Sequence, residues 1–206
     1  MRDECIDGIV QYGATKFPNL SFDSGICRAR INPVDGQVYV VGLKGWQTTA
    51  AKDACFQRVR YTGKPVRMPS SLHVKEDGIE IGFTVPIDAS TAGDRDSYDI
   101  EQWNYIWSQS YGSPEVTVED PNKHGHDVVE VKSVEVCADH KSVKLKIANL
   151  QPVMQMKISM KINAADGAPI EYDVYNTINK VPGYVNKPKP VTQPIAVRAT
   201  TQASAR

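Results

Sequence analysis

The chain has 206 residues, of which 41% are apolar and 23% are charged, an ordinary composition for a folded protein with one large domain or two small ones. Lysine and arginine number 24, as do aspartate and glutamate, so no net charge attracts nucleic acid or an anionic membrane. No apolar run approaches the ~20 residues of a membrane helix. The opening MRDECIDGIV lacks the pattern of a secretory signal. We expect no nucleic-acid partner, no membrane span and no signal peptide in this chain.

The amino-terminal third predicts four short strands, at 8–12, 26–31, 37–43 and 56–61, separated by turn sequences such as NPVDG and YTGKP. Helical periodicity is scarce throughout the chain. The four strands predict one small antiparallel sheet, which has two faces to bury and too little core to be stable alone. We therefore expect residues 1–65 to resemble a terminal blade of a β-propeller, which packs between neighbouring blades.

Residues 66–182 show a cleaner alternation of apolar and polar side chains, and a last strand is expected at 171–178. Several strands with one apolar face each predict a sandwich of two antiparallel sheets, and an immunoglobulin-like module fits this pattern. The apolar residues expected to face its core are Ile79, Ile81, Phe83, Val85, Val134, Val136, Val143, Leu145, Ile147, Met154, Met156, Ile158, Met160 and Ile162.

These patterns predict an all-β chain, with a partial propeller blade followed by an immunoglobulin-like β-sandwich. The boundary is expected near 63–69, where GKPVRMP supplies two prolines and a glycine. Residues 183–206 are rich in Pro, Thr and Ala and predict a flexible tail.

Aromatic residues are the strongest candidates for ligand contact. In WNYIWSQSY, Trp103, Tyr105 and Trp107 would project to one face of a strand and could stack on sugar rings, although core packing is the commoner use of such side chains. Trp46 lies in the loop KGWQTTAAKDAC, where packing between blades competes with substrate contact.

Two polar clusters suggest metal ligands. The sequence NKHGHD places His124 and His126 beside Asp127, which suits zinc or copper only if His73, His140 or an aspartate elsewhere completes the site. A solvated turn is the favoured interpretation.

The second cluster is DASTAGDRDSYD, which supplies several carboxylates for calcium but lacks the order of an EF-hand loop. Aspartate is common in turns because its side chain bonds to the nearby backbone. The acids concerned are Asp88, Asp94, Asp96 and Asp99.

Neither the spacing of the cysteines nor any catalytic motif indicates a metal site or an active site. The four cysteines form no CxxC pair, and a disulfide between Cys27 and Cys55 stays open because geometry decides it. No G-x-S-x-G, G-x-x-x-x-G-K-[ST] or G-x-G-x-x-G motif occurs. We expect no catalytic, cofactor-binding or metal-binding residue in this chain.

Residues 24–66, SGICRARINPVDGQVYVVGLKGWQTTAAKDACFQRVRYTGKPV, resemble the closing blade of the glucose/sorbosone dehydrogenase-like β-propellers of large exported proteins from planctomycetes and related bacteria. The later segments FTVPIDASTAGDRDSYDIEQWNYIWSQSYGS, GHDVVEVKSVEV, LQPVMQMKI and AADGAPIE are similar to the immunoglobulin-like module that follows that propeller. The resemblance spans roughly residues 6–180.

Members of this family are often described as haem-binding proteins or membrane-bound dehydrogenases. The resemblance implies a periplasmic or extracellular location, with the remaining propeller blades or a partner chain as neighbours. Pyrroloquinoline quinone, calcium or haem c would belong to a full-length parent, since this chain has no CxxCH motif for covalent haem.

The chain is thus expected to be the non-catalytic carboxy-terminal part of an exported propeller protein, acting as a structural or interaction module. One alternative is a module that binds carbohydrate or another surface, with polysaccharide as the ligand. Another is a part of a sugar or alcohol dehydrogenase whose active site lies in upstream blades.

Overall fold

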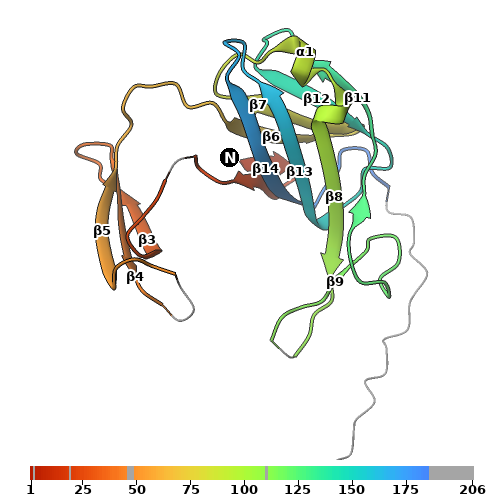
Figure 1. The fold of residues 1–206 in the computed structure, drawn as a ribbon. Coiled ribbons are helices and arrows are strands. Elements are labelled where there is room, and N and C mark those ends of the chain that lie inside the picture. Colours follow the sequence, from red (N-terminus) through yellow and green to blue (C-terminus); the bar gives the residue numbers. More distant parts are fainter. Residues whose placement is uncertain (2, 19, 46–48, 110, 186–206) are drawn as a thin grey trace, which may run out of the picture.

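The computed structural model describes residues 1, 3–18, 20–45, 49–109 and 111–185 (Figure 1). Its elements are nearly all antiparallel strands, which confirms the expected all-β class. The helical elements within these residues are a single turn, α1 (Ala89–Ala92), and a 3-10 turn, η1 (Arg95–Ser97). No helix among the described residues is long and apolar enough to cross a membrane.

The larger sheet curves around one side of the core (Figure 1). Its strand order is β1 (Asp3–Ile6), β2 (Ile9–Thr15), β14 (Pro169–Ile178), β13 (Val153–Asn163), β8 (Tyr98–Tyr105) and β10 (Asp127–Val128), with β9 (Glu115–Val116) also paired to β8.

A second sheet packs against the first. Its strand order is β11 (Val131–Val136), β12 (Ser142–Ile147), β7 (Gly78–Phe83) and β6 (Pro69–Lys75). The strand expected to start after Gly78 includes this residue, because Gly78 already pairs with Lys75 and Lys146. A Cβ on Gly78 would lie 1.9 Å from the carbonyl oxygen of Leu145, so the close approach of the two strands requires glycine.

The core between the two sheets is formed by the alternating side chains that the sequence predicted. Ile79 and Ile81 of β7 and Leu145 of β12 are fully buried, and they belong to one cluster with Ile158 of β13 and Val174 of β14. Because period-two alternation places every second residue on one face, these strands bury one side and expose the other. The sandwich is therefore a complete two-layer unit.

Three residues expected in the core, Val85, Val134 and Val136, are only partly buried against it, and one is exposed. Met154 is 52% exposed, whereas Val153 and Met156 are buried. The register between β13 and β14 shifts between Val153 and Met156, so the strand carries an irregularity that a strict alternation cannot predict.

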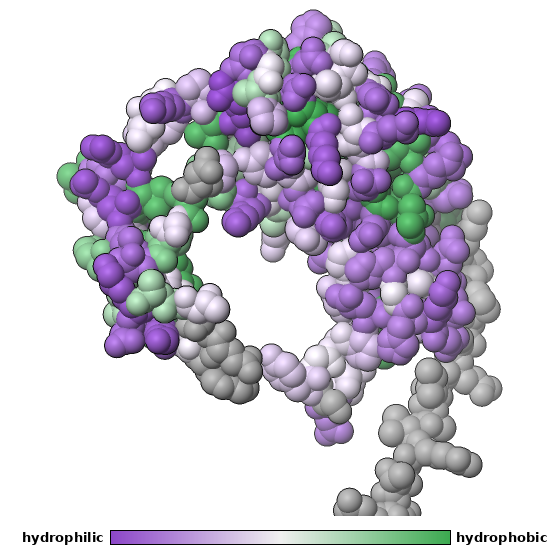
Figure 2. Space-filling model, viewed as in Figure 1, coloured by the Kyte–Doolittle hydropathy of each residue, from purple (hydrophilic) through white to green (hydrophobic). Residues whose placement is uncertain are grey.

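A third sheet stands apart from the sandwich. It contains β3 (Gly25–Ile31), β4 (Val38–Leu43) and β5 (Ala54–Val59) in that order. In Figure 1 it lies to one side, joined to the sandwich by the segments before β3 and after β5. In the space-filling view an opening separates its lower part from the sandwich (Figure 2).

The four-stranded sheet expected within residues 1–65 therefore has three strands. The strand expected at 8–12 is β2, which pairs with β14 and with β1 at the edge of the larger sandwich sheet. The chain leaves the sandwich after β2 and returns at β6, close to the boundary expected at 63–69. The three-stranded sheet is thus an excursion between two sandwich strands, since the residues before it also belong to the sandwich. The tail at 186–206 lies outside the described residues.

Candidate functional site

The three-stranded sheet has an inner face, which is turned toward the sandwich, and an outer face. Cross-strand partners share a face, and Ala29, Val40 and Gln57 form one inner row across the three strands. Among the buried hydrophobic residues of the described chain, only Val40 comes from this sheet. The sheet therefore has almost no core of its own.

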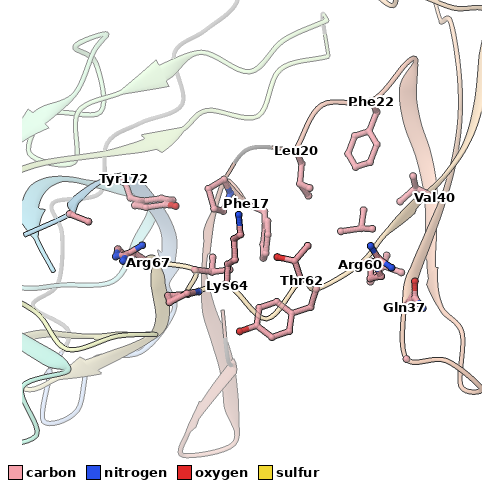
Figure 3. Close-up of a pocket in the computed structure, with 18 of the residues that line it drawn as sticks. Phe17, Leu20, Phe22, Gln37, Val40, Arg60, Thr62, Lys64, Arg67 and Tyr172 are labelled. Atoms are coloured by element: carbon pink, nitrogen blue, oxygen red, sulfur yellow. The ribbon is translucent and has the colours of Figure 1, made fainter. Parts of the chain in front are cut away.

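The inner face lines an apolar groove with a volume of about 1000 Å³ (Figure 3). Phe17, Leu20 and Phe22, which precede β3, form part of its wall together with Val40, and Tyr172 of β14 lies at the sandwich end. A groove of this size and character accepts a small apolar molecule or the side chains of another polypeptide.

Basic side chains also line the groove. Arg67 pairs with Asp166, which raises the pKa of the guanidinium and lowers the pKa of the carboxyl group through their hydrogen bonds. Lys64 and Arg60 are exposed side chains along the same groove (Figure 3). The groove thus combines an apolar floor with positive charge, but it contains no arrangement of side chains that defines a reaction.

The outer face exposes apolar side chains to solvent. Val41 and Leu43 are 44% and 54% exposed, and Phe56 is 73% exposed. The ring of Phe56 stacks on Tyr39, with 5.8 Å between the ring centroids and 24° between the planes. Exposed apolar patches of this kind are typical of surfaces that bind other proteins. The outer face is the clearest candidate site in the described part of the chain.

The aromatic residues considered as a binding platform do not share one surface. Trp103 is 5% exposed and lies beneath His126, with 3.9 Å between ring centroids and 11° between ring planes. Tyr105 is half-buried, and Trp107 is 82% exposed beyond the end of β8. A ligand could reach Trp107 but not the covered indole of Trp103. Trp46 lies outside the described residues.

His126 is held between two glutamates on the outside of the larger sheet. Its Nε2 lies 2.9 Å from Glu115 and its Nδ1 lies 3.3 Å from Glu101. Desolvation lowers the pKa of His126, but the hydrogen bonds and charges of both glutamates outweigh this effect, so the pKa is raised above its ordinary value of 6.5. The aromatic face of Trp103, on which His126 stacks, also favours the protonated form of the imidazole.

This arrangement agrees with a turn better than with the zinc or copper site considered from NKHGHD. The two glutamates lie at opposite nitrogens of the His126 ring and do not converge on one point. Asp127 is already used, because its Oδ2 accepts hydrogen bonds from the backbone of Val118 and Glu119. Within the described ranges, no group of three or more His, Cys, Asp or Glu side chains is placed to hold a metal ion.

Two of the four carboxylates considered for calcium, Asp88 and Asp94, cap local turns. Asp88 caps α1 by accepting a hydrogen bond from the backbone N–H of Thr91 at 2.9 Å, and this bond lowers the pKa of Asp88. Asp94 caps η1 in the same way through the N–H of Asp96 at 3.0 Å. The turn-forming role of aspartate explains these two members of the cluster.

The disulfide left open from the sequence does not form, and Cys27 and Cys55 are free. They lie on β3 and β5, with β4 between them. Adjacent strands are ~4.8 Å apart, so residues two strands apart are separated by about 9.6 Å, which exceeds the ~7 Å that a disulfide can span.

The sequence did not predict the apolar outer face of the third sheet, because the residues that form this face are divided among three strands. Tyr39, Val41 and Leu43 alternate along β4, and Arg28 and Arg30 alternate along β3. Each alternation is visible in the sequence. Their convergence on one surface becomes visible only once the strand register is known.

No protein-family model, curated protein or solved structure matches this chain.

Proposed function

We propose that this chain is a non-catalytic interaction module, in which the sandwich is the folded base and the three-stranded sheet packs against another polypeptide. The observation that carries the proposal is the exposure of apolar side chains on both faces of that sheet. Ile31 on the inner face is 69% exposed, and Phe56 on the outer face is 73% exposed. A sheet of three short strands gains little stability without a hydrophobic face to pack on, and a partner would supply it.

The resemblance to exported propeller proteins supplies one candidate for the partner, namely the other blades of a propeller. In a propeller each blade is covered on both faces by its neighbours, and this would cover both faces of β3, β4 and β5. On this proposal the location is periplasmic or extracellular, and pyrroloquinoline quinone, calcium or haem c would belong to a larger parent assembly.

Site-specific photo-cross-linking in cells that carry the gene tests the proposal. A photoreactive benzoylphenylalanine replaces Phe56 on the outer face, and in a control protein it replaces Val128, which is 86% exposed on the sandwich. We expect a discrete adduct of higher mass from position 56 and none from position 128. The absence of an adduct at position 56, or the same pattern at both positions, would contradict the proposed function.

A second candidate function is the binding of polysaccharide by the hairpin between β8 and β9. Trp107 is 82% exposed, and Tyr111 in the same hairpin is fully exposed. Exposed aromatic rings stack readily on the apolar faces of sugar rings. A Trp107→Ala variant should lose retention on an insoluble polysaccharide while keeping its thermal melt. Equal retention of the variant and the wild type, or no retention of either, would remove this candidate.

A further inference from the structure

The three-stranded sheet carries a surplus of positive charge although the whole chain is neutral. Between residues 25 and 59 the sequence contains five basic and two acidic side chains, a surplus of three positive charges. The formal net charge of the whole chain is zero. The remainder of the chain therefore carries a formal net charge of minus three, so residues 25–59 are more basic than the chain as a whole.

The strand register brings three arginines together on the outer face. Arg30 and Arg58 flank Tyr39 as its direct cross-strand partners. Arg28 is the partner of Val41 in the next row, and Phe56 is the partner of Val41 on the opposite side. Three guanidinium groups thus surround the exposed apolar centre of the sheet.

These guanidinium groups are available to a partner. Arg28 donates from Nη1 to the carbonyl oxygen of Cys27 at 2.7 Å, and Arg30 donates in the same way to Ala29 at 2.8 Å. These bonds leave most of the five donors of each guanidinium free. The ion pairs found among the described residues include none of Arg28, Arg30 or Arg58.

The nearest acid does not neutralise this surface. Asp35, at the turn before β4, accepts hydrogen bonds from the hydroxyl of Tyr39 at 2.8 Å and from the backbone of Gln37 at 3.0 Å. Arg58 is within electrostatic reach of Asp35. One carboxylate therefore faces three guanidinium groups, and the surface keeps an excess of positive charge.

The mixture of side chains identifies the chemistry of the partner. Arginine binds carboxylates through paired hydrogen bonds, and arginine and aromatic residues are enriched where proteins bind each other. Val41 and Leu43, on the same face of the central strand β4, suit aliphatic side chains. A single-stranded nucleic acid instead needs aromatic rings free to stack on successive bases, whereas Tyr39 and Phe56 are already stacked on each other.

We infer that the outer face of the sheet β3–β4–β5 binds an acidic segment of a partner polypeptide, with its carboxylates on Arg28, Arg30 and Arg58 and its apolar side chains over Val41 and Phe56. This inference rests on the proposed function of the sheet as a docking element and specifies its partner.

Fluorescence polarisation with the full chain tests the inference. The probe is a short fluorescein-labelled peptide in which glutamate alternates with leucine and phenylalanine, and the reference probe has glutamine in place of glutamate. We expect the acidic peptide to bind more tightly than the glutamine peptide, and its affinity to fall as salt is raised. The triple variant Arg28→Gln, Arg30→Gln, Arg58→Gln should weaken binding by about tenfold or more, since each exposed charge pair contributes modestly.

A matched control and a competing ligand make the result decisive. Arg95→Gln removes an exposed arginine of the sandwich and should leave the affinity unchanged. Equal binding of the two peptides, equal binding by the triple variant, or no binding of the acidic peptide would overturn the inference. Tighter, arginine-dependent binding of oligothymidylate would overturn it in favour of nucleic acid.

The cross-linking experiment separates this inference from the proposed function. If position 56 gives an adduct, mass spectrometry of that adduct identifies the partner segment. A segment without Asp or Glu near the cross-link would overturn the acidic partner while the interaction function stands. No adduct would overturn both.

Discussion

His126 combines three contacts that each favour its protonated form. Both ring nitrogens face glutamates, Glu101 and Glu115, and the ring lies flat on Trp103. The folded state thus raises the pKa of His126 above 6.5 even though desolvation acts in the opposite direction. A group whose pKa is raised on folding stabilises the fold fully below its unfolded pKa, and this contribution is lost as the pH rises through the folded pKa.

We predict that a His126→Phe variant loses this pH dependence. Phenylalanine keeps a flat ring on Trp103 but cannot be protonated. The stability of the wild type relative to the variant should be highest at about pH 5.5, with a pH-dependent part of no more than about 1 kcal/mol because the site is partly exposed, and it should fall as the pH rises above 6.5 through the raised pKa of the folded state. Urea unfolding at several pH values measures it. A difference that is constant or grows with pH would contradict the assignment of the ion pairs.

At the scale of single residues, the sequence predicted the environment of a side chain better than the residues that it contacts. It favoured a solvated turn around His126 and core packing for Trp103. Trp103 is buried, but beneath the ring of His126 and not within the core cluster of the sandwich. Their stacking depends on the pairing of β8 with β10, which brings Asp127 opposite Gln102. This pairing spans a long connection whose path the local pattern does not encode.

Among the elements, β13 shows how an irregular register redistributes burial. Met154 and Met156 occupy equivalent positions in a strict alternation, yet Met156 is completely buried and Met154 is 52% exposed. The register shift between Val153 and Met156 accounts for the difference.

The two methionines provide a matched pair of substitutions. Met156→Ala should lower the free energy of unfolding by about 2–5 kcal/mol, because it leaves a cavity in a packed core. Met154→Ala should lower it by less than about 1 kcal/mol, as is usual for an exposed side chain. Urea denaturation compares them directly. Similar losses for both variants would show that β13 follows the strict alternation after all.

The strand β2 shows what the sequence could not decide. Its existence was predicted at 8–12, but its assignment to one sheet with 26–31, 37–43 and 56–61 was wrong, because alternation defines a buried face without naming the sheet that provides it. Pairing with β14, more than 150 residues later, connects both ends of the described sandwich. Local patterns therefore predicted most strands, and long-range register decided how they were grouped.

At the scale of the whole molecule, the chain combines a sandwich with a complete core and a small sheet without one. The buried cluster contains residues of both sandwich sheets and none from β3, β4 or β5. The candidate site lies on the sheet that lacks a core. The apolar side chains of this sheet remain exposed within the chain, and a partner would bury them.

Hydrogen exchange of the isolated full chain tests this account most directly. The strands β4 and β13 are both central strands with neighbours on each side, so hydrogen bonding alone gives them similar protection. Because β4 lacks a buried core, its amides should exchange at least about a hundredfold faster than those of β13, through local opening of the small sheet. Equal protection of β4 and β13 would contradict the account, because the sheet would then be stable without a partner.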